Sequence, residues 1–173
     1  MKQYWLMKSE PDVYSIDDMK RDGKTLWTGV RNYQARNYMM GDVAIPGAPK
    51  KTEAAMKAPT MAPGDEFLFY HSNAEPPGVA GIGRISKVGV PDPEQFNKKL
   101  EVFEPKATKE KPVWFCSEVE FVKKFDRVIP LDEIRSEKSL AKMVLLQKGS
   151  RLSVQPVLKA EFERLAKLSQ KKP

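Results

Sequence analysis

Cysteine, histidine and long apolar runs are nearly absent from this sequence. Cys116 is the single cysteine and His71 the single histidine, so the chain cannot form an internal disulfide or a multi-histidine metal site. The longest apolar runs, such as VWFC at 113–116, are far shorter than the roughly 20 residues that cross a bilayer. We therefore expect no metal, no cofactor and no association with membranes.

An export signal is also missing. The sequence starts MKQYWLMKSEP, which has no apolar h-region. Together with the scarcity of cysteine, this start is typical of a cytosolic or nuclear chain, and we expect a cytoplasmic location.

The common catalytic motifs are missing as well. The sequence has no G-x-S-x-G element, and GVAGIG (78–83) lies in a predicted hairpin rather than at a strand-to-helix turn, which argues against Rossmann and P-loop sites. We identify no catalytic residue and expect a protein that is not an enzyme. An enzyme that acts on a nucleotide, with His71 as the acid–base group, is the least favoured alternative.

What the sequence does contain fits one globular domain. Its 173 residues, of which 40% are hydrophobic and 31% are charged, can bury a core without metals or disulfides. The net charge of +7 and the pI near 9.4 favour a polyanionic partner. A basic surface that only keeps the protein soluble explains the same charge equally well, so charge alone does not decide the function.

Patterns along the chain predict a single α+β domain over residues 1–173, with a small mixed sheet curled into a partial barrel and flanked by short helices. Strands are expected at 4–8, 65–72, 78–90, 113–125 and 150–157, and helices at 12–23, 30–39 and 158–168. The stretch 130–146 is expected to form one or two short helices, interrupted near Ser136. Trp5, Trp114 and Cys116 fall within predicted strands and are expected in the core. The stretch at about 41–62, which contains several prolines and lysines, is predicted to be an inserted surface loop.

Four clusters of polar and aromatic residues stand where predicted core elements end or begin. They are MKSEP (7–11), WTGVRNYQARN (27–37), FYHSN (69–73) and RLSVQP (151–156). One such cluster is usually a satisfied structural network, but four of them indicate a shared pocket. Asn and Gln bond base edges, aromatic rings stack on bases, and Arg or Lys holds phosphate. We interpret the segment 27–37 as one wall of a nucleobase pocket.

The same segments carry a family resemblance. YWLMKSEP, WTGVRNYQARN, FYHSN, PGVAGIGRI and RLSVQPV resemble, in this order, the signature blocks of the EVE domain family. This family includes the thymocyte nuclear proteins of vertebrates and has a PUA-like fold, a small β-barrel flanked by helices. Its members are viewed as non-catalytic readers of modified bases, especially 5-methylcytosine and its oxidised forms in DNA.

The resemblance implies a site and a partner for this chain. Trp27 would be the aromatic wall of the base pocket, and the other pocket residues would be Lys8, Ser9, Asn32, Gln34, Tyr70, His71 and Ser72. Phosphate-binding or pocket-bracing roles would fall to Arg31, Arg36 and Arg151. The expected partner is modified DNA, bound by a monomer through a flipped or single-stranded base. An RNA-binding or RNA-modification accessory protein is the main alternative, because PUA-like domains often occur in proteins that bind or process RNA.

Two features depart from the family pattern. Thr28 follows Trp27 where the family more often has an acidic residue, and the stretch at 41–62 replaces a short connection. Because both features adjoin the predicted pocket, they bear on which ligand is bound rather than on the fold.

Overall fold

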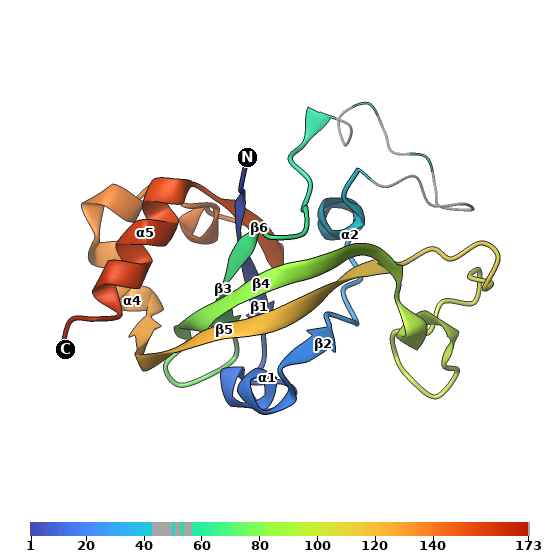
Figure 1. Ribbon diagram of the computed structural model, residues 1–173, viewed down its shortest axis with the longest axis horizontal. Coiled ribbons are helices and arrows are strands. Elements are labelled where there is room, and N and C mark those ends of the chain that lie inside the picture. Colours follow the sequence, from blue (N-terminus) through green and yellow to red (C-terminus); the bar gives the residue numbers. More distant parts are fainter. Residues whose placement is uncertain (43–49, 51–52, 54–56, 173) are drawn as a thin grey trace.

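The described part of the chain comprises residues 1–42, 50, 53 and 57–172 of a computed structural model (Figure 1). Its strands are β1 (Tyr4–Ser9), β2 (Lys24–Leu26), β3 (Glu66–His71), β4 (Gly78–Pro91), β5 (Phe115–Pro130) and β6 (Val154–Val157). Its helices are α1 (Ile16–Asp22), α2 (Tyr33–Met40), α4 (Leu131–Ser136) and α5 (Lys159–Leu168), with 3-10 turns η1 (Pro93–Phe96), η2 (Lys138–Leu140) and η3 (Val144–Leu146). The strands and helices expected from the sequence are present, but the stretch 130–146 contains only α4 and the 3-10 turns η2 and η3, and β5 begins after Trp114. Only β2 was missed, because three residues are too few to show a period.

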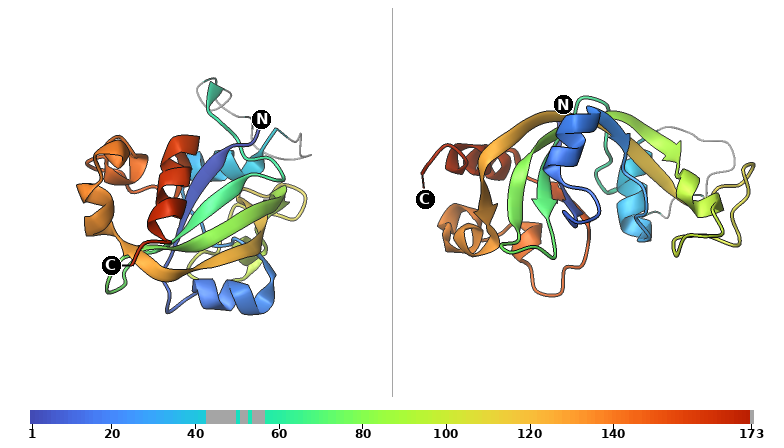
Figure 2. Two further views of the ribbon diagram at one scale, coloured as in Figure 1. Left: turned by 60° about the vertical axis from the view of Figure 1, so that its left-hand side comes forward. Right: turned by 90° about the horizontal axis from the view of Figure 1, so that it is seen from below.

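The described strands form one mixed sheet in the order β2-β5-β4-β3-β1-β6. β1 and β3 run parallel, with Lys8 opposite Tyr70 and Ser9 opposite His71, and the remaining neighbours pair antiparallel. The α+β class is therefore confirmed. The expected barrel is not, because within the described residues β2 and β6 remain the two open edges of a strongly curved sheet (Figure 2).

Alternation of side chains along the strands divides the core between the two faces of the sheet. Trp5 and Met7 of β1 belong to one hydrophobic cluster, which includes residues of α1 and α2. Leu6 belongs to a second cluster, which includes residues of α4 and α5. The expectation that Trp5 and Cys116 are core residues is confirmed, since each is at most 1% exposed. Burial raises the pKa of the Cys116 thiol to about 12, so the group stays protonated at neutral pH.

Helix α1 begins and ends where its sequence predicts. The Ser15 hydroxyl accepts a hydrogen bond from the Asp18 backbone N–H, and the Asp18 carboxylate accepts one from the Ser15 backbone N–H. This reciprocal capping box starts the helix, and Gly23, with φ of 75°, ends it. The cap places Ile16 against β3, where its backbone N–H donates to His71.

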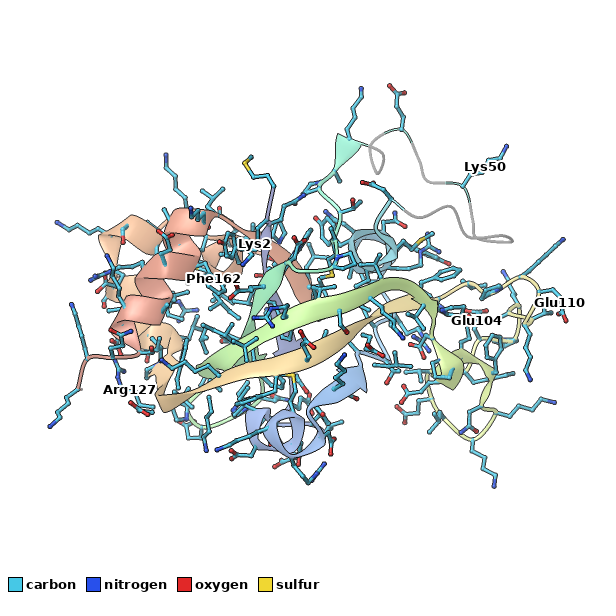
Figure 3. All side chains as sticks on the ribbon, in the orientation of Figure 1. Lys2, Lys50, Glu104, Glu110, Arg127 and Phe162 are labelled. Atoms are coloured by element: carbon cyan, nitrogen blue, oxygen red, sulfur yellow. The ribbon has the colours of Figure 1, made fainter. Side chains whose placement is uncertain are left out.

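The connection between β4 and β5 lies at one end of the molecule, with labelled residue Glu104 far from Arg127 at the opposite end (Figure 3). Gln95, which is fully buried, holds this connection together. Its amide nitrogen donates to the carbonyls of Asp92 and Trp114, and its amide oxygen accepts from the N–H groups of Val113 and Trp114. The connection is therefore a fixed part of the fold.

The predicted inserted loop lies partly outside the described residues, at 43–49, 51–52 and 54–56. Its two ends are described and lie side by side. The carbonyl of Tyr38 accepts hydrogen bonds from the N–H groups of Gly41, at 3.4 Å, and Met61, at 2.9 Å. Met61 is also buried in the core, so the chain returns to the domain at that residue.

Two further findings hold for the described residues. None of the helices there is both long and apolar enough to traverse a membrane. Nor do these residues include a group of three or more His, Cys, Asp or Glu side chains placed to hold a metal ion.

Candidate functional site

A cavity of about 730 Å³ lies where the carboxyl end of β1 meets the segment that follows β2. Its size falls within the range of small-molecule and cofactor sites. Two aromatic residues, Tyr14 and Trp27, contribute to its wall. The other polar and charged lining residues are Lys8, Ser9, Thr25, Thr28, Arg31, Glu94, Glu101 and Ser153. The cavity thus combines an aromatic wall with hydrogen-bond donors and acceptors, and its lining includes both positively and negatively charged residues.

Trp27 forms the boundary between this cavity and the core. Its ring packs edge-on against Phe67 and Phe69, with centroids 5.7 and 5.3 Å away. Its backbone N–H donates to the carbonyl of Ser117 at 2.9 Å, which fixes the segment against β5. Only 6% of the residue is exposed. Trp27 therefore lines the cavity, as predicted, and is a core residue at the same time.

Lys8 and Ser9 reach the cavity from the end of β1. The Lys8 N–H donates to the Ser153 carbonyl at 2.8 Å, which ties this strand end to the segment before β6. The Ser9 hydroxyl donates to the Tyr14 carbonyl at 2.7 Å. The Lys8 ammonium lies 5.7 Å from the centre of the Tyr70 ring, and burial lowers the pKa of this ammonium. Lys8 therefore contributes to the wall of the cavity, while its ammonium lies beside Tyr70 and is partly withdrawn from water.

The turn at 28–31 is held by a carboxylate that the sequence did not reveal. Asp92 is 1% exposed and accepts hydrogen bonds from the Gly29 N–H at 2.8 Å and from the Arg31 guanidinium at 2.9 Å. Gly29 has φ of 85°, a conformation that side chains disfavour, and a Cβ there would lie 3.4 Å from the Glu94 carboxylate. Arg31 also donates to the Val102 carbonyl at 3.0 Å. Arg31 is thus a bracing residue of the cavity wall.

Asn32 and Gln34 lie outside the cavity, contrary to their predicted role as base-contacting residues. The Asn32 side chain caps α2 by accepting a hydrogen bond from the Ala35 N–H at 3.1 Å. Gln34 is exposed and donates to the Tyr38 hydroxyl at 2.8 Å. The reason is local: α2 needs an N-cap, and an Asn directly before a helix supplies it.

The residues 70–72 also stand apart from the cavity lining. Tyr70 is 4% exposed and packs in the cluster on the other face of the sheet, where burial raises its pKa. His71 accepts a hydrogen bond from the Ile16 N–H at 3.1 Å through Nε2, and burial lowers the pKa of this imidazole. Ser72 donates its backbone N–H to the Ser9 carbonyl at 3.0 Å. These three residues therefore lie outside the cavity lining, next to the end of β1.

The arginines divide into two kinds. Arg36 is 6% exposed and donates to the Val113 carbonyl at 3.1 Å, while its guanidinium lies 4.7 Å from the Tyr33 ring centre. It is a bracing residue. Arg151 is exposed at the surface, where phosphate is accessible.

The EVE domain family model matches the chain over residues 3–45 and 41–168. The chain belongs to the EVE domain family. Human thymocyte nuclear protein 1 is 36% identical to it over 192 residues, an alignment that takes in all of this chain and 76% of the relative.

Two solved structures show the same fold. A hypothetical protein from Leishmania major has a TM-score of 0.83 and 40% identity, with 98% of this chain and 96% of that chain covered. Human THYN1 protein in complex with DNA containing 5-methylcytosine has a TM-score of 0.81 and 36% identity, with 99% of this chain and 100% of that chain covered.

The relatives correct the expected location. The human and mouse relatives of this EVE domain are both named as nuclear proteins. That name points to the nucleus, so the cytoplasmic prediction is wrong. A sequence without an export signal leaves both compartments open, and scarce cysteine does not distinguish them.

Several residues of the EVE domain site were missed by sequence reasoning. Asp92, Glu94 and Glu101 all come from the β4–β5 connection, which folding brings against the turn at 28–31. One signal was available: the PDPEQF segment contains an Asp before Pro-Glu, which is a helix-capping pattern. That pattern locates a fixed turn but does not indicate which distant segment the turn supports.

Proposed function

We propose that this EVE domain is a non-catalytic reader that holds one modified pyrimidine of DNA, 5-methylcytosine or an oxidised form, in the cavity beside Trp27. The cavity carries the proposal, because its lining offers an aromatic wall together with both donors and acceptors. The similarity to a human protein crystallised with DNA containing 5-methylcytosine supports the choice of ligand. The curved sheet is consistent with the PUA-like barrel of the family. We propose that the protein binds DNA as a monomer.

The lining matches the hydrogen-bonding edge of cytosine. That base presents an exocyclic amine that donates at N4, and two acceptors at N3 and O2. In the proposed complex, the Glu94 carboxylate accepts from the N4 amine, while the Ser153 hydroxyl donates to one of the acceptors. The apolar lining residues Leu26 and Val30 take the 5-methyl group. A base can reach such a cavity only when it is extruded from a duplex or single-stranded.

The proposal assigns no chemical step to His71. Its Nε2 already accepts the Ile16 N–H, and the residue is absent from the cavity lining. An enzyme that uses this imidazole would require that hydrogen bond to break. Turnover of a nucleotide by the wild-type protein that disappears in His71→Gln would contradict the non-catalytic assignment.

Three oligonucleotides of one sequence test the ligand, with 5-methylcytosine, cytosine or thymine at a single position. Thymine keeps the 5-methyl group but presents a carbonyl in place of the N4 amine. We expect affinity in the order 5-methylcytosine, cytosine, thymine, measured by fluorescence anisotropy on single strands. Equal affinity for the three bases would contradict the proposal. Preference for RNA of the same sequence over all three DNAs would favour an RNA-binding function instead.

A pair of charge-matched variants tests the role of Glu94. Glu94→Gln replaces one carboxylate oxygen, an acceptor, by an amide NH2, a donor. The ratio of the affinity for thymine DNA to the affinity for 5-methylcytosine DNA should therefore rise by roughly tenfold or more, as for one lost base contact. Glu110→Gln removes the same charge from the exposed end of the β4–β5 connection, outside the cavity lining. It should leave the preference unaltered. The same change in both variants would mean that charge, and not base contact, sets the preference.

A further inference from the structure

Tyr33 presents an exposed aromatic ring next to the cavity wall. It is the first residue of α2 and is 59% exposed, the one aromatic residue among the exposed large hydrophobic side chains of the described chain. Its ring lies parallel to that of Trp114, with centroids 4.8 Å apart and an interplanar angle of 20°. The exposed ring is therefore one layer of a stack and not an isolated surface side chain.

The layer beneath Tyr33 is held firmly. Trp114 is 6% exposed, both its backbone N–H and its carbonyl bond to the Gln95 side chain, and its indole N–H donates to Glu104 at 3.3 Å. Two guanidinium groups lie against this indole, that of Arg31 at 5.3 Å and that of Arg36 at 5.8 Å from the ring centre. A ring that is held rigidly and contacted by two cations can support a second aromatic ring stacked on it.

The outer face of Tyr33 is left open by these contacts. The Arg36 guanidinium lies 4.7 Å from the Tyr33 centroid and 5.8 Å from the Trp114 centroid. A group on the opposite face of Tyr33 from Trp114 would lie much farther from the indole than this. Arg36 therefore sits on the protected side of Tyr33, and the exposed side faces solvent.

Arg31 connects this stack to the cavity. It lines the cavity, and its guanidinium also lies over Trp114. A strand whose base occupies the cavity would continue past Arg31 toward Tyr33. Nucleic-acid-binding proteins stack successive bases on aromatic side chains in this way, with little dependence on sequence because every base has a π-face.

We propose that Tyr33 is a second base-binding subsite, which stacks a nucleotide neighbouring the one held in the cavity. This inference rests on the proposed function, since it places a strand through the cavity. Its ligand class is any nucleobase of a single-stranded or locally opened strand. The cavity selects the modified base, and Tyr33 adds affinity without selectivity.

The test uses single-stranded oligonucleotides that carry one 5-methylcytosine and either normal neighbours or abasic neighbours. Tyr33→Ser should weaken binding of the normal oligonucleotide by about tenfold, a typical value for one lost base–aromatic stack. The ratio of affinities for 5-methylcytosine and cytosine should stay the same. With abasic neighbours, wild type and Tyr33→Ser should bind equally, because no base remains to stack.

Two controls separate stacking from general surface effects. Tyr33→Phe keeps the ring and should bind within about twofold of wild type. Leu158→Ser removes a side chain from another surface, where the residue is 68% exposed, and should not affect binding. If Tyr33→Ser folds poorly by thermal unfolding, Tyr33→Leu keeps an apolar cover over Trp114 without a π-face and should show the same loss.

Outcomes for the two proposals differ. Wild-type affinity in Tyr33→Ser and Tyr33→Leu, or a loss that persists with abasic neighbours, would overturn the stacking subsite. A wild-type protein that does not distinguish 5-methylcytosine from cytosine, yet loses affinity in Tyr33→Ser only when neighbouring bases are present, would retain the stacking surface and overturn the pocket for a modified base.

Discussion

Trp27 shows that one side chain can have two roles that sequence reasoning treats as alternatives. Its ring supports Phe67 and Phe69 from one side and bounds the cavity from another. The sequence indicates an aromatic residue near polar neighbours, which fits a binding wall. It does not indicate that the exposed fraction is only 6%, because that value depends on strands far away in the sequence.

Replacement of Trp27 should therefore affect stability and binding together. Trp27→Ala should lower the free energy of unfolding by about 3–5 kcal/mol, as for other buried aromatic residues. Affinity of the remaining folded protein for 5-methylcytosine DNA should fall by roughly one to two orders of magnitude. Urea unfolding and binding isotherms on the same sample check both values. Normal binding by the folded fraction would remove Trp27 from the site.

His71 should make stability depend on pH. Burial lowers the pKa of its imidazole in the folded protein, below the value of about 6.5 for an exposed histidine. The folded state then binds the proton less readily than the unfolded state. Stability should be complete above about pH 6.5 and should decline as pH falls toward the lowered pKa.

Urea unfolding at pH 7.5 and pH 5.5 would measure this decline. In His71→Gln, whose amide oxygen can still accept the Ile16 N–H, the decline between those two pH values should be smaller. A wild-type protein that becomes more stable on acidification over this range would contradict the assignment.

At the scale of elements, local signals predict most of the fold. The capping box of α1, the alternation in β5 and the proline that suits β6 to an edge are all set by neighbouring residues. Closure of the sheet into a barrel is not set by neighbouring residues, because it requires pairing between β2 and β6, which are distant in the sequence. A curled sheet that forms a partial barrel was predicted, but not that β2 and β6 would be its open edges.

The same division explains the site. Lys8, Ser9 and Trp27 were predicted because each lies where a buried segment ends in polar residues. Asn32 was misassigned because a side chain that caps a helix and one that contacts a base look alike in sequence. The acidic residues that complete the cavity come from the β4–β5 connection, and only the tertiary structure places them there.

The turn at 28–31 should be sensitive to loss of glycine. Gly29→Ala should destabilise the protein by about 1–2 kcal/mol, because φ of 85° disfavours a side chain. It should also weaken DNA binding, because relief of the backbone strain would shift a turn whose residues line the cavity, with the new methyl group in contact with Glu94 at 3.4 Å. Gly23→Ala is the matched control, with φ of 75° and open space around the added carbon. It should cause a similar loss of stability without a change in binding, as measured by urea unfolding and anisotropy.

For the whole molecule, the net charge of +7 should appear as a salt dependence of DNA binding. Arg151→Gln should lower the slope of log K against log salt by about 0.7 on single strands, equally for modified and plain DNA. Arg36→Gln should keep the slope but lose stability, by about 1–3 kcal/mol, because it breaks a bond to the Val113 carbonyl beneath Tyr33. A loss of base discrimination in Arg151→Gln with an unchanged slope would instead make Arg151 a base reader.

The paired hydrogen bonds on the Tyr38 carbonyl have a consequence for the part of the chain that joins Gly41 to Met61. Gly41 and Met61 are anchored to the same oxygen atom, so the positions of the two chain ends do not depend on what joins them. Lengthening a flexible connection between fixed ends changes the folding free energy by only about 0.6 kcal/mol for each doubling. The family model also matches in two parts, 3–45 and 41–168, which overlap at residues 41–45. The length and sequence of the chain between Gly41 and Met61 can therefore change at little cost to the folded domain, which leaves the cavity beside Trp27 as it is.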